Sequence, residues 1–341
     1  MESIYEDQRM EMVKPVGGPI LEVKNLTISA PSLKKELIKS MDLAIQPGKM
    51  LGLIGESGSG KSLTAAAILG LLPPTLQVTG GKITFMDLEI TALPENKARA
   101  LRGRDIAYLS QNYQGFFTPF IKIGEQLVEV IQSHGRMKKS EAKEKSLYWL
   151  DKVSLPAQRV YDSYPYQLSG GMLQRASIAS AIMFRPKLII ADEPSTALDV
   201  LTGERILDLL VELQQELNCS VLLISHDLNH IINRTEEMAV MYGGQIVEQG
   251  STAEVHRNPV HPYTQMLLQS RLKLSRNIPD RLPAMEGEAA WVEKSGCPFA
   301  PRCKWASAQC HEIPPMSKIN GSHLVACHAV SAERMKAYAR S

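Results

Sequence analysis

The stretch that decides the fold is residues 50–69, MLGLI-GESGSGKS-LTAAAIL, in which an apolar run, a glycine-rich loop and a helix-prone run follow one another. The glycines let the loop turn its backbone N–H groups toward phosphate oxygens, at backbone angles that a Cβ would obstruct. Lys61 then reaches the β- and γ-phosphates, and Ser62 opens a helix where its hydroxyl can bind Mg²⁺. A chance turn between strand and helix is the alternative for the motif alone. We predict a phosphate-binding loop that consists of Gly55, Glu56, Ser57, Gly58, Ser59, Gly60, Lys61 and Ser62.

Length, charge and hydropathy narrow the class of protein. With 341 residues and 44% hydrophobic content, the chain can bury one large core and form a second, smaller unit. The net charge of +2 gives no basic field of the kind that attracts nucleic acid. The sequence has no apolar run of the roughly 18 to 20 residues that a membrane span needs, and its N-terminus lacks the pattern of a secretion signal. We therefore expect two domains in a cytosolic chain that can dock on a membrane protein.

Short apolar strands alternate with longer helical stretches along most of the chain. Before them, residues 1–18 are charged, end in a Pro-Val-Gly-Gly run and are expected to form a flexible leader. Strands are expected at residues 20–23, 50–54, 105–109, 187–191 and 220–224. Near-continuous apolar strands separated by helices predict an α/β fold whose parallel sheet is covered on both faces.

Three segments depart from this alternation. Residues 112–186 have mostly helical patterns and predict a helical insertion. Residues 238–249 predict a hairpin that turns at Gly243-Gly244. After about residue 270 the composition shifts to proline, cysteine and scattered charge, so a separate extension is expected at 271–341.

Two carboxylates, Asp192 and Glu193, follow the apolar run 188–191. An open parallel sheet places its ligand chemistry just past the carboxyl ends of its strands. Asp192 is suited to hold Mg²⁺ through water, and Glu193 to polarise an attacking water. An acidic turn after a core strand is the alternative, and it would be favoured if this run stood alone.

A second glycine-rich segment opens a predicted helix and offers another anion site. It consists of Leu168, Ser169, Gly170, Gly171 and Met172. With this segment in place, residues 20–270 resemble the ATP-binding cassette family in the order of their motifs. The resemblance implies a P-loop NTPase cassette at residues 19–270, with a RecA-like core, an antiparallel β subdomain and a helical subdomain, followed by a small extension that contains cysteines.

The motifs of the family fall on defined residues by this resemblance. Gly55–Ser62 is the Walker A loop, Asp192 and Glu193 form the Walker B pair, and Gln111 is the Q-loop glutamine. His226 is the switch histidine, which in its neutral form bonds the γ-phosphate. The D-loop residues are Ser195, Ala197, Leu198 and Asp199. The resemblance thus assigns catalysis to Glu193, His226 and Gln111, and Mg²⁺ binding to Ser62, Asp192 and Gln111.

Members of this family are expected to work in pairs, in which the signature loop 168–172 of one chain closes on the nucleotide held by the other. ATP, bound with Mg²⁺, then holds the two halves together, and hydrolysis releases them.

Three positions depart from the family pattern. Ala30 stands where an aromatic usually stacks on adenine, and Met172 stands where many cassettes have Gln. The loop 112–119 lacks the commoner Asp-Pro continuation. This loop is expected to face the membrane partner.

Four of the five cysteines lie in the extension, with the spacing C-x5-C-x6-C-x16-C. They are Cys297, Cys303, Cys310 and Cys327. Disulfides are not expected to persist in a cytosolic chain, so this clustering indicates a soft metal centre that offsets a small core. The fifth, Cys219, is expected to be a small buried hydrophobe.

The extension resembles the C-terminal region of oligopeptide and dipeptide importer ATPases, as does the His261-Pro262-Tyr263-Thr264 segment before it. The resemblance implies that the four cysteines ligate a 4Fe-4S cluster, with Zn²⁺ or plain reduced thiols as alternatives. The histidines at 311, 323 and 328 are alternative ligands or simply solvated side chains.

The function implied by the resemblance is that of an ATPase subunit on the cytoplasmic face of the membrane. It powers import of di- and oligopeptides below two transmembrane permeases, and it forms a heterodimer with a second ATPase. The substrate arrives through an extracytoplasmic substrate-binding protein. Nickel or a metal chelate is the alternative cargo. A soluble cassette ATPase that acts on ribosomes or DNA is a rival of another class, disfavoured because the chain has one Walker A motif and no sustained heptad run. A nucleotide sensor without turnover is a third, disfavoured by Glu193 and His226.

Overall fold

The computed structural model describes residues 17–270 and 296–330. The predicted leader therefore lies almost entirely outside the described residues, as do parts of the predicted extension. In the described parts of the chain, no helix is both long and apolar enough to span a bilayer.

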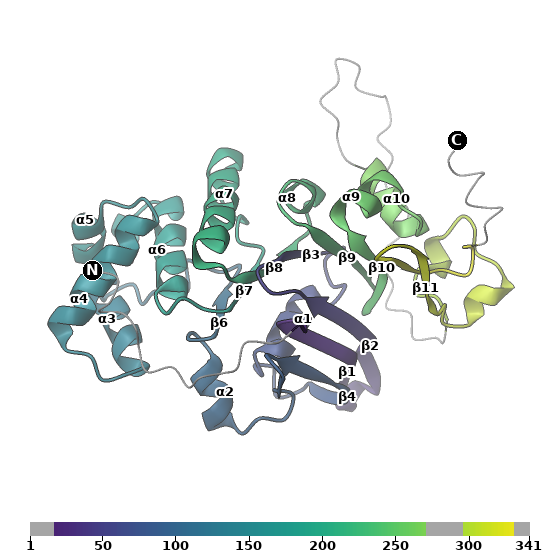
Figure 1. Cartoon of the computed structure of the whole chain (residues 1–341), viewed down its shortest axis with the longest axis horizontal. Helices are drawn as coiled ribbons and strands as arrows, with labels where there is room; N and C mark the ends of the chain where they lie inside the picture. The colour runs from purple at the N-terminus through teal and green to yellow at the C-terminus, as the bar shows by residue number, and fades with distance from the viewer. Residues whose placement is uncertain (1–16, 271–295, 331–341) are drawn as a thin grey trace, which may run out of the picture.

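A mixed sheet of eight strands runs through the molecule in the order β11-β12-β10-β9-β3-β8-β7-β6 (Figure 1). Its strands are β3 Met50–Ile54, β6 Ile106–Leu109, β7 Leu188–Asp192, β8 Ser220–Ser225, β9 Glu237–Tyr242, β10 Gln245–Ser251, β11 Met316–Asn320 and β12 His323–Ala326. Strands β9, β3, β8, β7 and β6 pair in parallel, and every residue of β3, β7 and β8 is buried. The expected parallel sheet is confirmed.

A second, antiparallel sheet packs on one face of the first. Its order is β2-β1-β4-β5, with β1 Leu21–Ala30, β2 Lys35–Ile45, β4 Gln77–Phe85 and β5 Leu88–Glu89. Of these strands, the sequence predicted only the start of β1; the antiparallel subdomain was implied by the resemblance alone. A short 3-10 helix, η2 Pro31–Leu33, links β1 to β2, and helix α2 Glu95–Leu101 follows β5.

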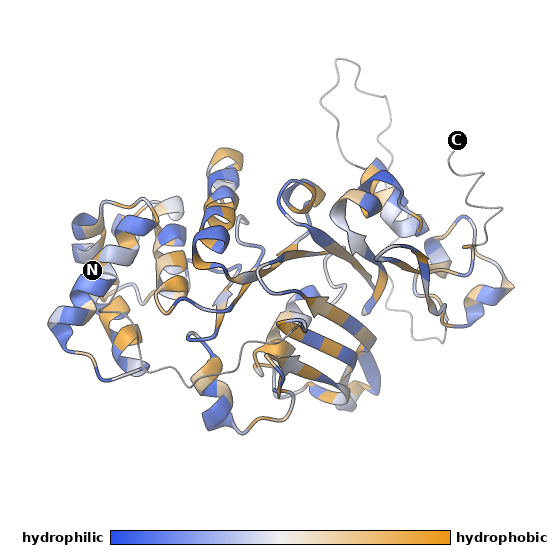
Figure 2. Cartoon of the chain, in the orientation of Figure 1, coloured by the Kyte–Doolittle hydropathy of each residue, from blue (hydrophilic) through white to orange (hydrophobic). Residues whose placement is uncertain are grey.

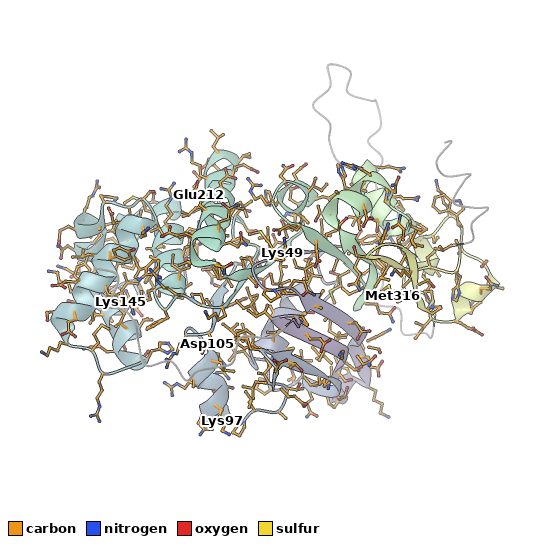
Figure 3. The ribbon with its side chains drawn as sticks, in the orientation of Figure 1. Lys49, Lys97, Asp105, Lys145, Glu212 and Met316 are labelled. Atoms are coloured by element: carbon orange, nitrogen blue, oxygen red, sulfur yellow. The ribbon has the colours of Figure 1, made fainter. Side chains whose placement is uncertain are left out.

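Helices cover the other face of the central sheet. The predicted helical insertion contains α3 Ile123–Ser133, α4 Lys139–Lys152, α5 Ala157–Asp162, η3 Pro165–Gln167 and α6 Gly170–Ile182. Helix α4 packs against α3, α5 and α6, and Lys145 on α4 marks this helical layer in Figure 3. The remaining helices are α7 Val200–Leu217, α8 Leu228–Ile232, α9 Thr252–Arg257, α10 Pro262–Gln269, η4 Ala300–Arg302 and η5 Ala308–His311.

Alternation along the buried strands separates two cores. Leu51 and Leu53 of β3 join the core that contains helix α1 Lys61–Ile68 and the antiparallel sheet, whereas Met50 and Ile54 join the core under α3 to α7. Side chains of neighbouring strand residues point to opposite faces of a sheet, so a strand with both faces covered is apolar throughout. Figure 2 shows apolar residues along the strands between these layers. The phosphate loop therefore begins from a strand that is fixed on both sides.

The described part of the extension joins the central sheet. Strand β12 pairs antiparallel with β10, and β11 pairs with β12 at the sheet edge, where Met316 is marked in Figure 3. The β9–β10 hairpin predicted at Gly243-Gly244 is confirmed. The sequence-based expectation of a small separate unit, stabilised mainly by metal, missed this pairing because it joins segments far apart in the chain.

Candidate functional site

The phosphate loop, residues 55–60, joins the end of β3 to the start of α1. Gly58 and Gly60 have φ of 79° and 111°, in the left-handed region that favours glycine. A Cβ on Gly55 would lie 2.1 Å from the carbonyl oxygen of Met241 on β9. The glycines at these positions are therefore required by backbone geometry, as the sequence predicted.

The Lys61 side chain binds the backbone at the start of the phosphate loop. Its Nζ donates hydrogen bonds to the carbonyl oxygens of Gly55 at 2.8 Å and Glu56 at 3.0 Å. Burial lowers the pKa of Lys61, while the carboxylates of Glu193 and Asp192 act in the opposite direction. A buried ammonium that has only carbonyl partners in the loop is suited to a phosphate anion.

Asp192, at the end of β7, lies beside Ser62. The Ser62 hydroxyl donates to Asp192 Oδ1 at 3.1 Å, and the Tyr108 hydroxyl donates to Asp192 Oδ2 at 3.2 Å. Burial raises the pKa of Asp192, although both hydrogen bonds favour its ionised form. A buried carboxylate next to a helix-opening serine supplies two oxygen ligands of the kind that Mg²⁺ takes.

Tyr108 has no distinctive sequence pattern around it and was not predicted as a site residue. This residue lies on β6 in register with Ile190 of β7, two positions before Asp192. Burial, followed by the nearby Asp192 carboxylate, raises the pKa of Tyr108 to about 12. The hydroxyl therefore stays protonated and donates to Asp192 at neutral pH. Strand alignment between β6 and β7 was needed to find it.

Glu193 and His226 meet at the ends of two neighbouring strands. Asp192 of β7 is in register with Ile224 of β8, so the residues that follow both strands lie side by side. His226 Nδ1 is 2.8 Å from each carboxylate oxygen of Glu193, and the exposed fractions of their side chains are 66% and 11%, respectively. Glu193 has a φ of 52°, a left-handed angle that is uncommon outside glycine, and its N–H donates to the Ile224 carbonyl at 3.0 Å. This backbone turn points the carboxylate toward the histidine.

The signature loop and the D-loop line a pocket of about 380 Å³. Its lining residues are Ser169, Gly170, Gly171, Met172, Arg175, Ala197, Leu198, Asp199 and Thr202. Ser169 is the N-cap of α6, where its hydroxyl accepts from the Met172 N–H at 3.3 Å. Gln174 Nε2 donates to the carbonyl of Pro194 at 2.9 Å, which ties α6 to the chain just after Glu193. Residues of the two loops thus form a surface at the N-terminus of α6, where the helix dipole favours an anion.

The loop after β6 has an inward and an outward side. Gln111 is exposed two residues beyond the end of β6. Tyr113 is buried, and its hydroxyl donates to the Ala197 carbonyl of the D-loop at 3.4 Å. Phe116 and Phe120 are exposed. The departure from Asp-Pro at this loop therefore puts a tyrosine against the D-loop, a contact that the sequence analysis did not predict.

His230 is a further residue that the sequence analysis missed. Its Nδ1 lies 3.2 Å from the Ser225 hydroxyl and 3.5 Å from the Ser195 hydroxyl, while its Nε2 lies 3.6 Å from a carboxylate oxygen of Glu204. Ser225 precedes the switch histidine and Ser195 opens the D-loop. The ring therefore bridges these two loops, and a histidine at the third position of a short helix gave no signal for it.

The cysteines of the extension are close enough to interact. Cys297 N–H donates to the Cys310 carbonyl at 2.9 Å. Burial, followed by the charges of Cys297, Cys303 and Cys310, raises the pKa of Cys327 to about 11. Within residues 17–270 and 296–330, however, no group of three or more His, Cys, Asp or Glu side chains is arranged to hold a metal ion.

The histidines offered as alternative ligands have other environments. His323 Nε2 lies 2.7 Å from Oε1 of Glu248, and the exposed fractions of the two side chains are 1% and 0%. His328 Nε2 lies 3.0 Å from the Glu312 carbonyl. His311 is exposed, at the end of η5. The expectation that His323 is solvated or a ligand was wrong, since it forms a buried pair with β10.

Two protein families match separate parts of the chain. Residues 38–196 match the ABC transporter family, and residues 247–310 match the oligopeptide/dipeptide transporter C-terminal region. The oligopeptide transport ATP-binding protein OppD of Escherichia coli (strain K12) is 38% identical over 330 residues, which are 95% of this chain and 97% of that protein. The dipeptide transport ATP-binding protein DppD of Haemophilus influenzae is 38% identical over 91% of this chain and 95% of its own.

Solved structures share the fold of the cassette. The ATP-binding cassette MJ0796, in a dimeric post-hydrolysis state bound to ADP and Pi, superposes with a TM-score of 0.60 and 28% identity, over 68% of this chain and 98% of its own. The cbiO1 protein of Clostridium perfringens, part of a cbiONQ transporter complex, gives a TM-score of 0.61 at 24% identity, over 70% of this chain and 91% of its own.

Proposed function

Because this chain belongs to the family of ATP-binding subunits of ABC transporters of the oligopeptide/dipeptide type, we propose that ATP hydrolysis on it powers the import of di- and oligopeptides. The observation that supports this cargo most directly is the match of residues 247–310 to the oligopeptide/dipeptide transporter C-terminal region. In this proposal residues 19–270 form the ATPase domain and residues 271–341 the extension.

The loop 55–62 would bind the phosphates of ATP, with its N–H groups and Lys61 as donors. Ser62, Asp192 and Gln111 would hold Mg²⁺, and the fit is supported by the buried, hydrogen-bonded carboxylate of Asp192 beside the Ser62 hydroxyl. Bound there, Mg²⁺ would neutralise charge that develops on the β- and γ-phosphates.

Glu193 is the proposed general base. Its carboxylate would accept a proton from the attacking water, and its contact with His226 would orient both side chains. His226 would bond the γ-phosphate and so distinguish ATP from ADP. The exposed position of the His226 ring, at the end of β8, supports this contact with a bound ligand.

The proposed active unit is a pair of ATPases, a heterodimer in which the loop 168–172 of one chain closes on the nucleotide of the other. Support comes from the pocket between the signature loop and the D-loop, whose helix N-terminus is suited to the γ-phosphate. The related cassette MJ0796 is a dimer with ADP and Pi bound.

We place the chain on the cytoplasmic face of the membrane, below two permeases that receive substrate from an extracytoplasmic binding protein. The exposed aromatic side chains of the loop after Gln111 support this docking, since Phe120 is 84% exposed and Phe116 lies nearby in the loop. Exposed aromatic clusters of this kind mark protein interfaces.

For the extension, we propose that Cys297, Cys303, Cys310 and Cys327 bind a 4Fe-4S cluster, with Zn²⁺ as the alternative. Burial, and after it the charges of neighbouring cysteines, raises the pKa of Cys297 and of Cys327, and a soft cation would relieve this repulsion between the deprotonated thiols. Iron and acid-labile sulfide analysis of anaerobically purified protein tests the cluster. Zinc without sulfide selects the alternative, and absence of both metals removes the proposal.

Uptake in cells that carry Glu193→Gln at the native locus tests the cargo, with labelled short peptides and chelated nickel compared in one medium. Loss of peptide uptake alone is expected. Loss of nickel uptake alone would keep the mechanism and change the cargo, whereas no loss of either would favour a soluble ATPase.

A further inference from the structure

The phosphate loop contains an acidic residue, Glu56, at a site for anions. A carboxylate next to bound phosphates repels them unless a cation neutralises it. The Glu56 carbonyl already accepts from Lys61, so the carboxylate and the phosphate-binding ammonium belong to the same loop. A cation beside the Glu56 carboxylate would therefore favour the binding of phosphates at this loop.

That cation comes from the cysteine-bearing extension. Arg302 Nη1 donates to Glu56 Oε2 at 2.8 Å and to the Tyr242 hydroxyl at 3.2 Å. The Arg302 side chain is only 8% exposed, and its guanidinium lies 5.9 Å from the centre of the Tyr242 ring. Removal of one partner from a largely buried ion pair costs more than removal from an exposed pair, because the other charge is left unpaired away from water.

The environment of Arg302 fixes its position. It ends η4, and its N–H donates to the carbonyl of Phe299 at 3.0 Å. Phe299 is fully buried, with its ring 5.2 Å from Tyr242 and 5.5 Å from Tyr263. The segment that presents Arg302 is thereby packed against the end of β9 and the start of α10.

The same aromatic cluster also holds the backbone of Glu56. The Glu56 N–H donates to the Tyr263 hydroxyl at 2.8 Å. Tyr263 on α10 and Tyr242 on β9 have ring centres 4.6 Å apart. The Glu56 carboxylate is therefore held by Arg302 of the extension. The Glu56 N–H is held by Tyr263, whose ring contacts Phe299 of the extension.

We propose that Arg302 is a positioning residue of the phosphate loop: from the extension it neutralises and orients Glu56, and so raises the affinity of the site for ATP. The inference rests on the proposed binding of ATP at residues 55–62. Docking of the extension and affinity for nucleotide are then coupled through one ion pair.

A double-mutant cycle on the full-length chain tests this, with the dissociation constant of a fluorescent ATP analogue as the readout. Arg302→Met leaves Glu56 charged and unpaired, and we expect the dissociation constant to rise about tenfold, the effect of losing one charge-assisted hydrogen bond. Glu56→Gln together with Arg302→Met removes both charges, and should return it to within about threefold of the wild type. Arg302→Lys should give an intermediate value, because it keeps the charge without the second bond.

Arg102→Met is the matched control. Arg102 forms a two-point ion pair with Glu95 and bonds the Leu69 carbonyl, at the end of α1 away from the loop, so its loss should leave the dissociation constant unchanged. Thermal unfolding of each variant reports whether the extension stays folded. An unchanged affinity in Arg302→Met overturns the proposal, as does a loss that Glu56→Gln fails to restore. Failure of the wild type to bind ATP would instead reject the nucleotide site itself.

Discussion

The phosphate loop and the C-terminal extension are held in place by different kinds of interaction. The turns of loop 55–60 come from its own glycines and from Lys61, and its remote contacts are confined to a few points such as Glu56. The extension depends on distant partners: β12 pairs with β10, and Arg302 meets Glu56 across 246 positions. A local motif is readable from the sequence, whereas a site built from remote segments needs the fold.

The largest expected effect concerns the proposed nucleotide site, to which the phosphate loop and Glu193 both belong. Glu193→Gln keeps the size and position of the side chain but removes the base, so we expect ATP turnover to fall by roughly a thousandfold while ATP binding is kept. Steady-state hydrolysis by the assembled transporter and equilibrium nucleotide binding measure the two quantities. Glu212→Gln, exposed on α7, is the control. Turnover at the wild-type rate would place the base on another residue.

The next effect concerns the anchor of the extension. Glu248 pairs with His323 and also accepts from the N–H groups of Val260 at 2.7 Å and His261 at 3.0 Å. Glu248→Ala leaves these buried donors unpaired, so we expect the free energy of unfolding to drop by about 3 kcal/mol.

Denaturant unfolding of the purified chain measures this loss. Glu22→Ala, which removes an exposed pair with Lys24, should cost less than about 0.5 kcal/mol. Equal losses in the two variants would mean that the extension contributes no more to stability than a surface ion pair.

The sequence predicted the elements that have a clear local pattern, and it missed those that depend on contacts between remote segments. The strands predicted at 50–54, 187–191 and 220–224 were found because most of their residues are apolar, as strands buried on both faces require. The residues after them were found because strand ends in a parallel sheet share one edge. The antiparallel sheet has mixed patterns and bulges, so it was identified only through the family resemblance.

Contacts between segments far apart in the sequence were not predicted, for a different reason. Tyr108 meets Asp192 only when β6 aligns with β7, and Arg302 meets Glu56 only when the extension packs on β9. Neither residue has a distinctive local pattern. The spacing of the four cysteines predicted a metal centre, for which the described residues show no suitable group of side chains, and it gave no sign that β12 would join the central sheet.

A smaller effect concerns Cys219, the buried cysteine of the cassette. Burial raises the pKa of Cys219 from 9.0 to about 11. The folded state binds this proton more tightly than the unfolded state, so the stabilisation is complete below pH 9 and is lost as the pH rises through 11. The shift corresponds to at most about 2 to 3 kcal/mol.

Unfolding as a function of pH checks this dependence. Cys219→Ala should flatten the fall in stability between pH 9 and 11, while it costs some stability at neutral pH through lost packing. A slope identical to that of the wild type would show that other groups account for the alkaline loss.

The smallest effect tests whether the loop after Gln111 acts on ATP turnover through its contact with the distant D-loop. Tyr113 is buried, and its hydroxyl donates to Ala197, a D-loop residue with a φ of 66°, at the long distance of 3.4 Å. Tyr113→Phe keeps the ring and removes this one weak bond, worth up to about 1 kcal/mol, so we expect kcat for ATP hydrolysis to fall about threefold. KM should not change, because the phosphate loop keeps its own contacts. Tyr148→Phe, on α4, should alter neither constant. A change in KM alone would place Tyr113 with the nucleotide site rather than with the D-loop, and the remote contact would then act on binding, as Arg302 does.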